Sequence, residues 1–207
     1  TGAGLLLDTL VACGVDTVFG YPGGAVLPLY DALARDGRLR HVLVRHEQAA
    51  VHAAQGYARS TGRLGVVFVT SGPGVANTTS GLLDALSDSI PVLCISGQVA
   101  TTSIGTDAFQ ECDALGISRT VTKWNTQLRA TRDIVATIRR AVAEATEGRP
   151  GPVLVDVPKD IQARAVEAAD FGRQVKPAPM LRAASEELDG LDAAALLIRK
   201  ARRPVFY

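Results

Sequence analysis

The sequence is short of aromatic residues, of cysteines and of charge of one sign, and each shortage excludes a class of protein. Aromatics make up 5% of the 207 residues, although 47% are hydrophobic, which is typical of α/β proteins whose parallel strands are buried on both faces. The 22 basic and 21 acidic residues leave neither a basic nucleic-acid footprint nor an acidic tail. The apolar runs are strand-sized, so none predicts a membrane span. The composition indicates one ordinary domain and the start of a second.

Cysteine usage predicts a reducing compartment. Cys13, Cys94 and Cys112 are odd in number, far apart and without CxxC spacing, so they indicate neither a disulfide framework nor a zinc site. No signal peptide is recognisable, and we expect a cytoplasmic protein. Because the chain begins without Met and ends in an apolar run, we expect it to be a piece of a longer polypeptide.

Short apolar runs alternate with longer amphipathic ones along most of the chain. Strands are expected at 17–20, 41–44, 65–70, 92–96, 121–125 and 153–157, and helices at 2–13, 26–36, 47–61, 75–89 and 131–147. This alternation predicts an α/β fold, a doubly wound and mostly parallel sheet with helices on both faces. We expect this domain at 1–165, a Pro-containing linker at 166–184, and a truncated second domain at 185–207 that opens with a helix to 200 and a strand at 205–207.

Two glycine-rich turns follow predicted strands, at 20–25 and 70–77. Ligands of open α/β sheets bind beyond the carboxyl ends of the strands, and glycine allows close approach of the backbone. Neither turn matches a dinucleotide fingerprint, because Asn77 replaces its third glycine, and neither has the lysine of a Walker A loop. From the residues alone, these segments are either simple turns or parts of a ligand site.

A charged turn and a polar loop leave similar alternatives open. Glu47 begins a predicted helix, where it is either a solvated first-turn carboxylate or part of a site. Ala50 stands where a zinc-binding HExxH motif needs its second His, so no metal site is expected in this chain. The loop at 104–111 is either a surface loop with Phe109 tucked into the core or a functional loop. The residues alone thus indicate an α/β domain with a ligand site built from several turns around Glu47.

Six segments, in this order, resemble the catalytic subunits of acetolactate (acetohydroxyacid) synthases, which are thiamine-diphosphate enzymes: YPGGAVLPLYDAL, RHEQAAVHAAQGYAR, VVFVTSGPGVAN, SGQVATTSIGTDAFQECD, TKWN and GRPGPVLVDVPKDIQ. The resemblance runs from about Gly2 to Gln162. It implies that the chain is the pyrimidine-binding domain at the N-terminus of such an enzyme.

The resemblance also implies roles for individual residues. Glu47 would hydrogen-bond the pyrimidine nitrogen of the cofactor, and it is expected to be catalytic together with Phe109 and Gln110. Other cofactor contacts are expected from Tyr21, Pro22, Gly23, Gly24, Pro73, Asn77 and Gln110, and a contact to FAD from Arg149. Residues of the substrate channel would be Ala25, Ala100, Ala108 and Lys159. Ala100 stands where many relatives have proline.

The implied reaction is the decarboxylation of pyruvate and ligation of the remaining unit to a second pyruvate or to 2-ketobutyrate, in branched-chain amino-acid biosynthesis. The resemblance implies FAD and Mg²⁺ as further cofactors, with Mg²⁺ held by a separate domain that carries a GDG motif, which this sequence lacks. It also implies a homo-oligomer with the site between subunits, and a regulatory small subunit. The alternatives are a sister thiamine enzyme, a non-catalytic assembly module and, least favoured, a nicotinamide-binding domain.

Overall fold

Six parallel strands form one sheet in the order β2-β1-β3-β4-β6-β5. The computed structural model describes residues 1–166 and 190–205. The strands are β1 (Thr17–Gly20), β2 (Arg40–Leu43), β3 (Gly65–Val69), β4 (Val92–Gln98), β5 (Trp124–Gln127) and β6 (Pro152–Pro158). The central strands β3, β4 and β6 are buried at every position, as continuous apolar runs in a covered parallel sheet must be. The predicted doubly wound α/β fold is confirmed.

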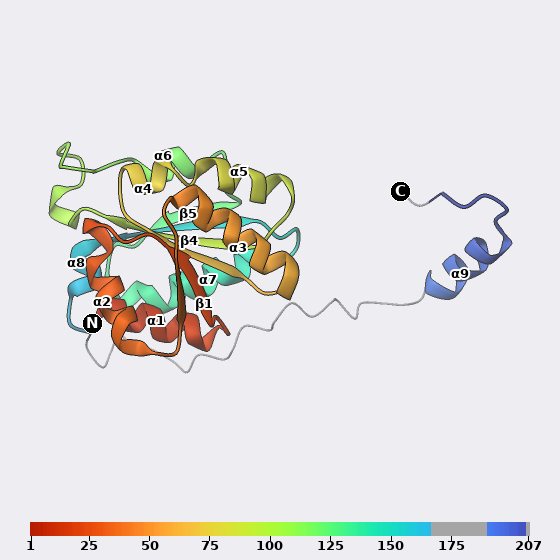
Figure 1. The fold of residues 1–207 in the computed structure, drawn as a ribbon, viewed down its shortest axis with the longest axis horizontal. Helices are drawn as coiled ribbons and strands as arrows, with labels where there is room; N and C mark the ends of the chain where they lie inside the picture. The colour runs from red at the N-terminus through yellow and green to blue at the C-terminus, as the bar shows by residue number, and fades with distance from the viewer. Residues whose placement is uncertain (167–189, 206–207) are drawn as a thin grey trace.

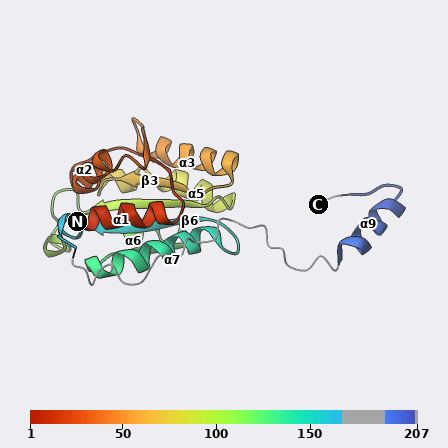
Figure 2. The same cartoon turned by 90° about the horizontal axis from the view of Figure 1, so that it is seen from below.

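Helices cover both faces of the sheet, as the two views agree (Figures 1 and 2). Side chains alternate along a strand, so Val66 and Phe68 pack toward one layer and Val67 and Val69 toward the other. The first layer contains α1 (Gly2–Ala12), α2 (Leu27–Asp36) and α7 (Ile134–Thr146), and the second contains α3 (Glu47–Thr61), α5 (Thr79–Ser87) and α6 (Ala114–Ser118). The two layers provide the two halves of the hydrophobic core.

Short elements flank the strand ends. They are η1 (Gly24–Val26), α4 (Pro73–Ala76), η2 (Thr101–Ser103), η3 (Thr131–Asp133) and α8 (Lys159–Ala163). The single helix expected at 75–89 is in fact α4 and α5, because α4 ends at Asn77. The strand expected at 121–125 begins only at Trp124, since Val121 still closes a turn on Ser118. Neither α6 nor α8 was predicted, because one to two turns carry no readable periodicity.

Beyond residue 189 the structure describes α9 (Leu191–Lys200), which lies within the helix expected at 185–200 and whose residues are all exposed. Val205 belongs to no strand, and the rest of the expected strand, like most of the expected linker, lies outside the described residues. The domain boundaries stay predictions. None of the helices described is long and apolar enough to cross a membrane.

Candidate functional site

The sheet topology selects one place for a site. The chain leaves β1 for β2 on one side and leaves β3 for β4 on the other, so the carboxyl ends of β1 and β3 form the switch point at which open α/β sheets bind ligands, and we call this place the crevice. The two glycine-rich turns predicted from the sequence follow these two strands, and α3 begins beyond the carboxyl end of neighbouring β2. The strand order therefore brings together three segments that the sequence could only name separately.

Glu47 is the buried carboxylate of this crevice. It is the first residue of α3, its exposed fraction is 7%, and the helix is capped by the His46 side chain, whose Nδ1 accepts from the Gln48 N–H at 3.2 Å. Asn77 Nδ2 donates a hydrogen bond to Glu47 Oε2 at 2.8 Å. The solvated alternative for Glu47 is wrong, because the second turn covers it. The remaining oxygen, Oε1, is available to another donor.

Glycines allow the two turns to close around Glu47. A Cβ on Gly23 would lie 2.5 Å from Thr70 Cβ, and a Cβ on Gly74 would lie 2.8 Å from Thr70 Cγ2 and 3.5 Å from Glu47 Oε1. Thr70 Oγ1 also accepts from the Ala25 N–H at 3.2 Å. Thr70 thus joins the first turn to the second. Thr70 lies in the VTSGPG segment of the sequence, but no local feature distinguishes it from an ordinary threonine at the end of a strand.

The loop between β4 and α6, residues 99–113, lies against the second turn. Gly72 has a φ of +58°, and a Cβ there would lie 2.8 Å from the Gln110 carbonyl oxygen, so the backbone of Gln110 approaches Gly72 closely. Phe109 is 89% exposed. The alternative in which Phe109 tucks into the core is therefore wrong, and its ring projects from this domain.

The expected channel residues lie along the same edge of the sheet. Lys159 is exposed at the start of α8, directly after β6, and Ala100 and Ala108 are half-buried in the loop. Ala25 is buried, and its carbonyl accepts from Gln162 Nε2 at 2.8 Å. Gln162 was not predicted as a site residue, because its partner Ala25 lies 137 residues away in the sequence.

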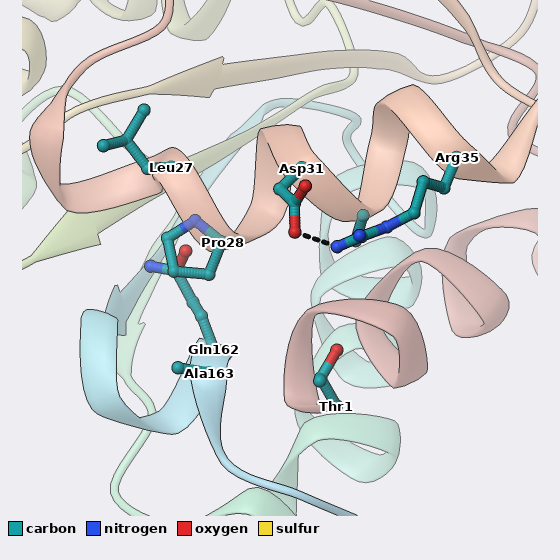
Figure 3. A pocket seen from close by; sticks show the side chains of 8 residues that line it. Thr1, Leu27, Pro28, Asp31, Arg35, Gln162 and Ala163 are labelled. Atoms are coloured by element: carbon teal, nitrogen blue, oxygen red, sulfur yellow. Dashed lines mark hydrogen bonds and ion pairs between the residues drawn. The ribbon is translucent and has the colours of Figure 1, made fainter.

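A hollow of about 350 Å³ lies beside this contact, between α2 and α8. Figure 3 shows Gln162 reaching from α8 toward Pro28 of α2, with the Asp31–Arg35 ion pair at the rim. Gln162 Nε2 also donates to the Val157 carbonyl at 2.8 Å, whereas its buried Oε1 has no partner. Gln162 therefore ties the first turn to the end of β6.

The other expected cofactor contacts differ in position. Tyr21 is 39% exposed and Pro22 and Gly24 are exposed, all in the first turn, and Pro73 begins α4. Arg149 lies at the opposite, amino edge of the sheet. Its guanidinium donates to Ser89 Oγ at 2.8 Å and to the Leu86 and Ser87 carbonyls, and so caps the end of α5. The structure thus places all expected residues except Arg149 at the carboxyl edge of the sheet.

A second buried carboxylate lies at the carboxyl edge, and sequence reasoning missed it. Asp156 in β6 is fully buried and accepts from Ser96 Oγ at 2.8 Å, Gln98 Nε2 at 3.1 Å and Gln127 Nε2 at 2.9 Å. Burial raises its pKa to about 6, against the lowering effect of these donors. The available signal was a lone acidic residue inside the apolar run VLVDVP.

Burial and charge also affect Tyr30, whose hydroxyl donates to the Phe68 carbonyl at 3.4 Å. Burial, followed by the negative charge of Glu47, raises the pKa of Tyr30.

Among residues 1–166 and 190–205, no group of three or more His, Cys, Asp and Glu is placed to hold a metal ion. The carboxylates, amides and backbone groups at this edge can orient a ligand and hydrogen-bond to it.

Comparison with known proteins places these features in a family. The family model described as "Thiamine pyrophosphate enzyme, N-terminal TPP binding domain" matches residues 1–117. The acetolactate synthase large subunit of Haemophilus influenzae is 56% identical over 160 residues, which are 77% of this chain and 28% of that protein. For the isozyme 3 large subunit of Escherichia coli the identity is 57%, over 78% of this chain and 28% of that protein. The mitochondrial acetolactate synthase catalytic subunit of Saccharomyces cerevisiae is 46% identical over 100% of this chain and 31% of its own length. The chain thus spans roughly a third of these relatives.

Proposed function

The chain belongs to the thiamine pyrophosphate (thiamine diphosphate) enzymes, and from this premise we propose that it is the cofactor-activating part of an acetolactate synthase. The family predicted from the sequence is confirmed by the match to more than half of the chain. The proposed reaction decarboxylates pyruvate and ligates the remaining unit to a second 2-keto acid, which yields 2-acetolactate or 2-aceto-2-hydroxybutyrate. The names of the relatives support this assignment.

The observation that carries the proposal is the half-satisfied carboxylate of Glu47. Asn77 holds Oε2, whereas Oε1 accepts from no donor in the described part of the chain, is not fully buried and lies beside Gly74, so it is open to a ligand. Thiamine pyrophosphate, when bound, supplies the nucleophilic carbon and accepts the electron pair released by decarboxylation. Glu47 would hold the proton at the pyrimidine ring nitrogen, while Asn77 keeps the carboxylate oriented through Oε2.

The surrounding turns support a cofactor site beside Glu47. Gly23 and Gly74 pack their backbones against Thr70, where any Cβ would clash, so glycine allows the two turns to lie close together next to this carboxylate. Tyr21, Pro22, Gly24, Pro73 and Gln110 would contact the cofactor. Phe109, Gln110, Ala25, Ala100, Ala108 and Lys159 would face the substrate.

The exposed Phe109 supports a site that is completed by another subunit. An aromatic ring that is 89% exposed is the kind of residue that protein interfaces bury. We propose a homo-oligomer in which a different domain holds the pyrophosphate and Mg²⁺, with FAD as a further cofactor contacted by Arg149. The relatives named large subunits favour a regulatory small subunit as a partner. The cytoplasm stays the predicted compartment.

The experiment is acetolactate formation from pyruvate by the full-length enzyme with thiamine pyrophosphate, Mg²⁺ and FAD. Wild type, Glu47→Gln and a control, Glu144→Gln, are compared; Glu144 lies on α7 in an exposed pair with Arg140. We expect acetolactate from wild type and control and almost none from Glu47→Gln. Acetaldehyde or acetyl phosphate as the only product would point instead to a sister thiamine enzyme, and no turnover of any 2-keto acid would point to an assembly module.

A further inference from the structure

The loop at 99–113 holds an exposed aromatic ring in a backbone conformation that is intrinsically unfavourable. Asp107 and Gln110 have φ values of +56° and +60°, in the left-handed region that non-glycine residues avoid. Such a loop keeps one conformation only if its surroundings fix it. The loop that carries Phe109 and Gln110 therefore needs anchors in the rest of the domain.

The loop is anchored from within and at both ends. Inside the loop, the Glu111 carboxylate accepts from the backbone N–H groups of Gly105 and Ala108. At its start, the Thr101 N–H and hydroxyl donate to the Asp160 carboxylate at 2.9 and 2.6 Å. At its end, the Cys112 carbonyl accepts from Gln98 Nε2 at 2.9 Å. This last anchor is the one nearest to Phe109 and Gln110 that comes from the sheet.

The Gln98 side chain leaves none of its amide hydrogens unused. Its Oε1 accepts from the Val99 N–H at 2.9 Å, and its Nε2 donates to the Cys112 carbonyl and to Asp156 Oδ2. An amide rotated by 180° would place its oxygen against the Asp156 carboxylate and against the Cys112 carbonyl. Asp156, together with the Cys112 carbonyl and the Val99 N–H, thus fixes which way the Gln98 amide faces, and the amide in turn holds the end of the loop.

Asp156 is better suited to this task than to stabilising the domain. It is fully buried, its three side-chain donors are neutral, and none of the ion pairs within the described part of the chain includes it. A buried carboxylate without a cation is costly, and such groups cluster at functional sites. Its place beside the anchor of the Phe109 loop gives it a function.

We propose that Asp156 and Gln98 are positioning residues: the Asp156 carboxylate orients the Gln98 amide, which clamps the Cys112 carbonyl and so presents Phe109 and Gln110 to the reaction pocket. The statement about loop order stands on the structure alone, whereas the consequence for the reaction rests on the proposed function. Neither residue needs to contact substrate or cofactor.

Two glutamines provide a matched test. Gln98 and Gln127 both donate to Asp156 Oδ2, but only Gln98 also reaches the loop. Hydrogen exchange is measured on the full-length enzyme without substrate, for wild type, Gln98→Met and Gln127→Met. Loss of the hydrogen bond to the Cys112 carbonyl predicts up to about tenfold faster exchange of amides 99–113 in Gln98→Met, and little change there in Gln127→Met, which loses only its bond to Asp156. Equal loop exchange in the two variants would overturn the proposal.

A second pair keeps the proposal testable if Gln98→Met does not fold. In Asp156→Asn the side-chain oxygen can accept from both Gln98 and Gln127, and the NH₂ group can donate to the Ser96 hydroxyl, which can rotate to accept. In Asp156→Ala no acceptor is left for either glutamine. We expect Asp156→Asn to retain slow loop exchange and Asp156→Ala to lose it, with unchanged exchange in α7 in both variants. Slow loop exchange in Asp156→Ala would contradict the proposal.

Catalysis is then the separate readout. With pyruvate, Gln98→Met and Asp156→Ala should lower kcat/KM about tenfold, whereas Asp156→Asn and Gln127→Met should stay near wild type. If the loop loosens while kcat/KM stays unchanged, the link to catalysis is wrong although the anchor is right. If the wild type makes no acetolactate at all, the proposed function fails but the exchange result still stands.

Discussion

Two buried carboxylates lie at the same edge of one sheet, and they differ in how far the protein satisfies them. Glu47, at the crevice between β1 and β3, receives one side-chain hydrogen bond and lies beside glycines. Asp156 lies on β6, between β4 and β5, where it receives three side-chain hydrogen bonds and is fully buried. A carboxylate left partly unpaired beside open backbone is suited to an external ligand, whereas a carboxylate saturated by its own chain is suited to holding that chain in place.

The largest effect expected from this contrast is on catalysis at Glu47. Glu47→Gln keeps the shape and the contact with Asn77 but removes the proton acceptor, so kcat for acetolactate formation should fall by about 10²–10⁴-fold. The melting temperature should change little, because an uncharged amide is the cheaper group to bury. Steady-state rates and thermal melts of the same preparations check both statements. A kcat near that of wild type would show that Glu47 has no part in the mechanism, and the functional contrast with Asp156 would not hold.

The next effect is on stability at Asp156 and depends on pH. The folded-state pKa is raised from 3.8 to about 6, so between these values the folded state binds more protons than the unfolded state, and stability falls as pH rises through this window. Nearby Asp113 raises the pKa further. A shift of this size corresponds to about 3 kcal/mol, so Asp156→Asn should be more stable than wild type above pH 6 by up to that amount.

Urea unfolding at pH 4 and pH 8 measures this difference. The gain in Asp156→Asn should be small at pH 4, where Asp156 is protonated in the folded state and only partly ionised in the unfolded state, and should be largest at pH 8. An equal gain at both pH values would show that the carboxylate charge is not the cause. Exposed Asp133→Asn serves as the control, because a solvated surface charge changes stability little.

A smaller effect is expected from the glycines that allow the two turns to close around Glu47. Gly23→Ala places a Cβ 2.5 Å from Thr70 Cβ, whereas a Cβ on adjacent Gly24 meets nothing within 4 Å. Overpacking of this kind costs about 1–3 kcal/mol, so Gly23→Ala should lower the free energy of unfolding and Gly24→Ala should leave it nearly unchanged. Chemical denaturation of the pair checks this. Equal stability in the two variants would mean that the first turn does not pack on Thr70 as described.

The smallest effect is expected at Asn77, which orients Glu47 without replacing it. Asn77→Ala removes the hydrogen bond to Oε2, and a hydrogen bond to a charged group contributes about 1.5–3 kcal/mol. We expect roughly a tenfold loss in kcat/KM, well below that of Glu47→Gln. The double variant should be no worse than Glu47→Gln alone, since residues that act as a unit are not additive. Additive losses in kcat/KM would show that Asn77 and Glu47 act independently of each other.

Local sequence was sufficient for much of the fold and for part of the site. The predicted helix at 47–61 matches α3 residue for residue, because the glycine that ends it and the apolar spacing within it are local signals. The strands at 17–20 and 65–70 were similarly clear. By contrast, the helix predicted at 75–89 is interrupted at Asn77, although the apolar spacing of this segment runs on past that residue.

Local patterns were enough to find the buried strand residues, the start of α3 and the turns that need glycine, since these follow from side-chain periodicity and backbone sterics over a few residues. Long-range packing, and no such pattern, places β1 between β2 and β3 and so creates the crevice. The same packing joins Asn77 to Glu47 over 30 residues, Gln98 to Asp156 over 58 and Gln162 to Ala25 over 137. Strand order results from covering both faces of the sheet at once, and no local pattern records which strands become neighbours.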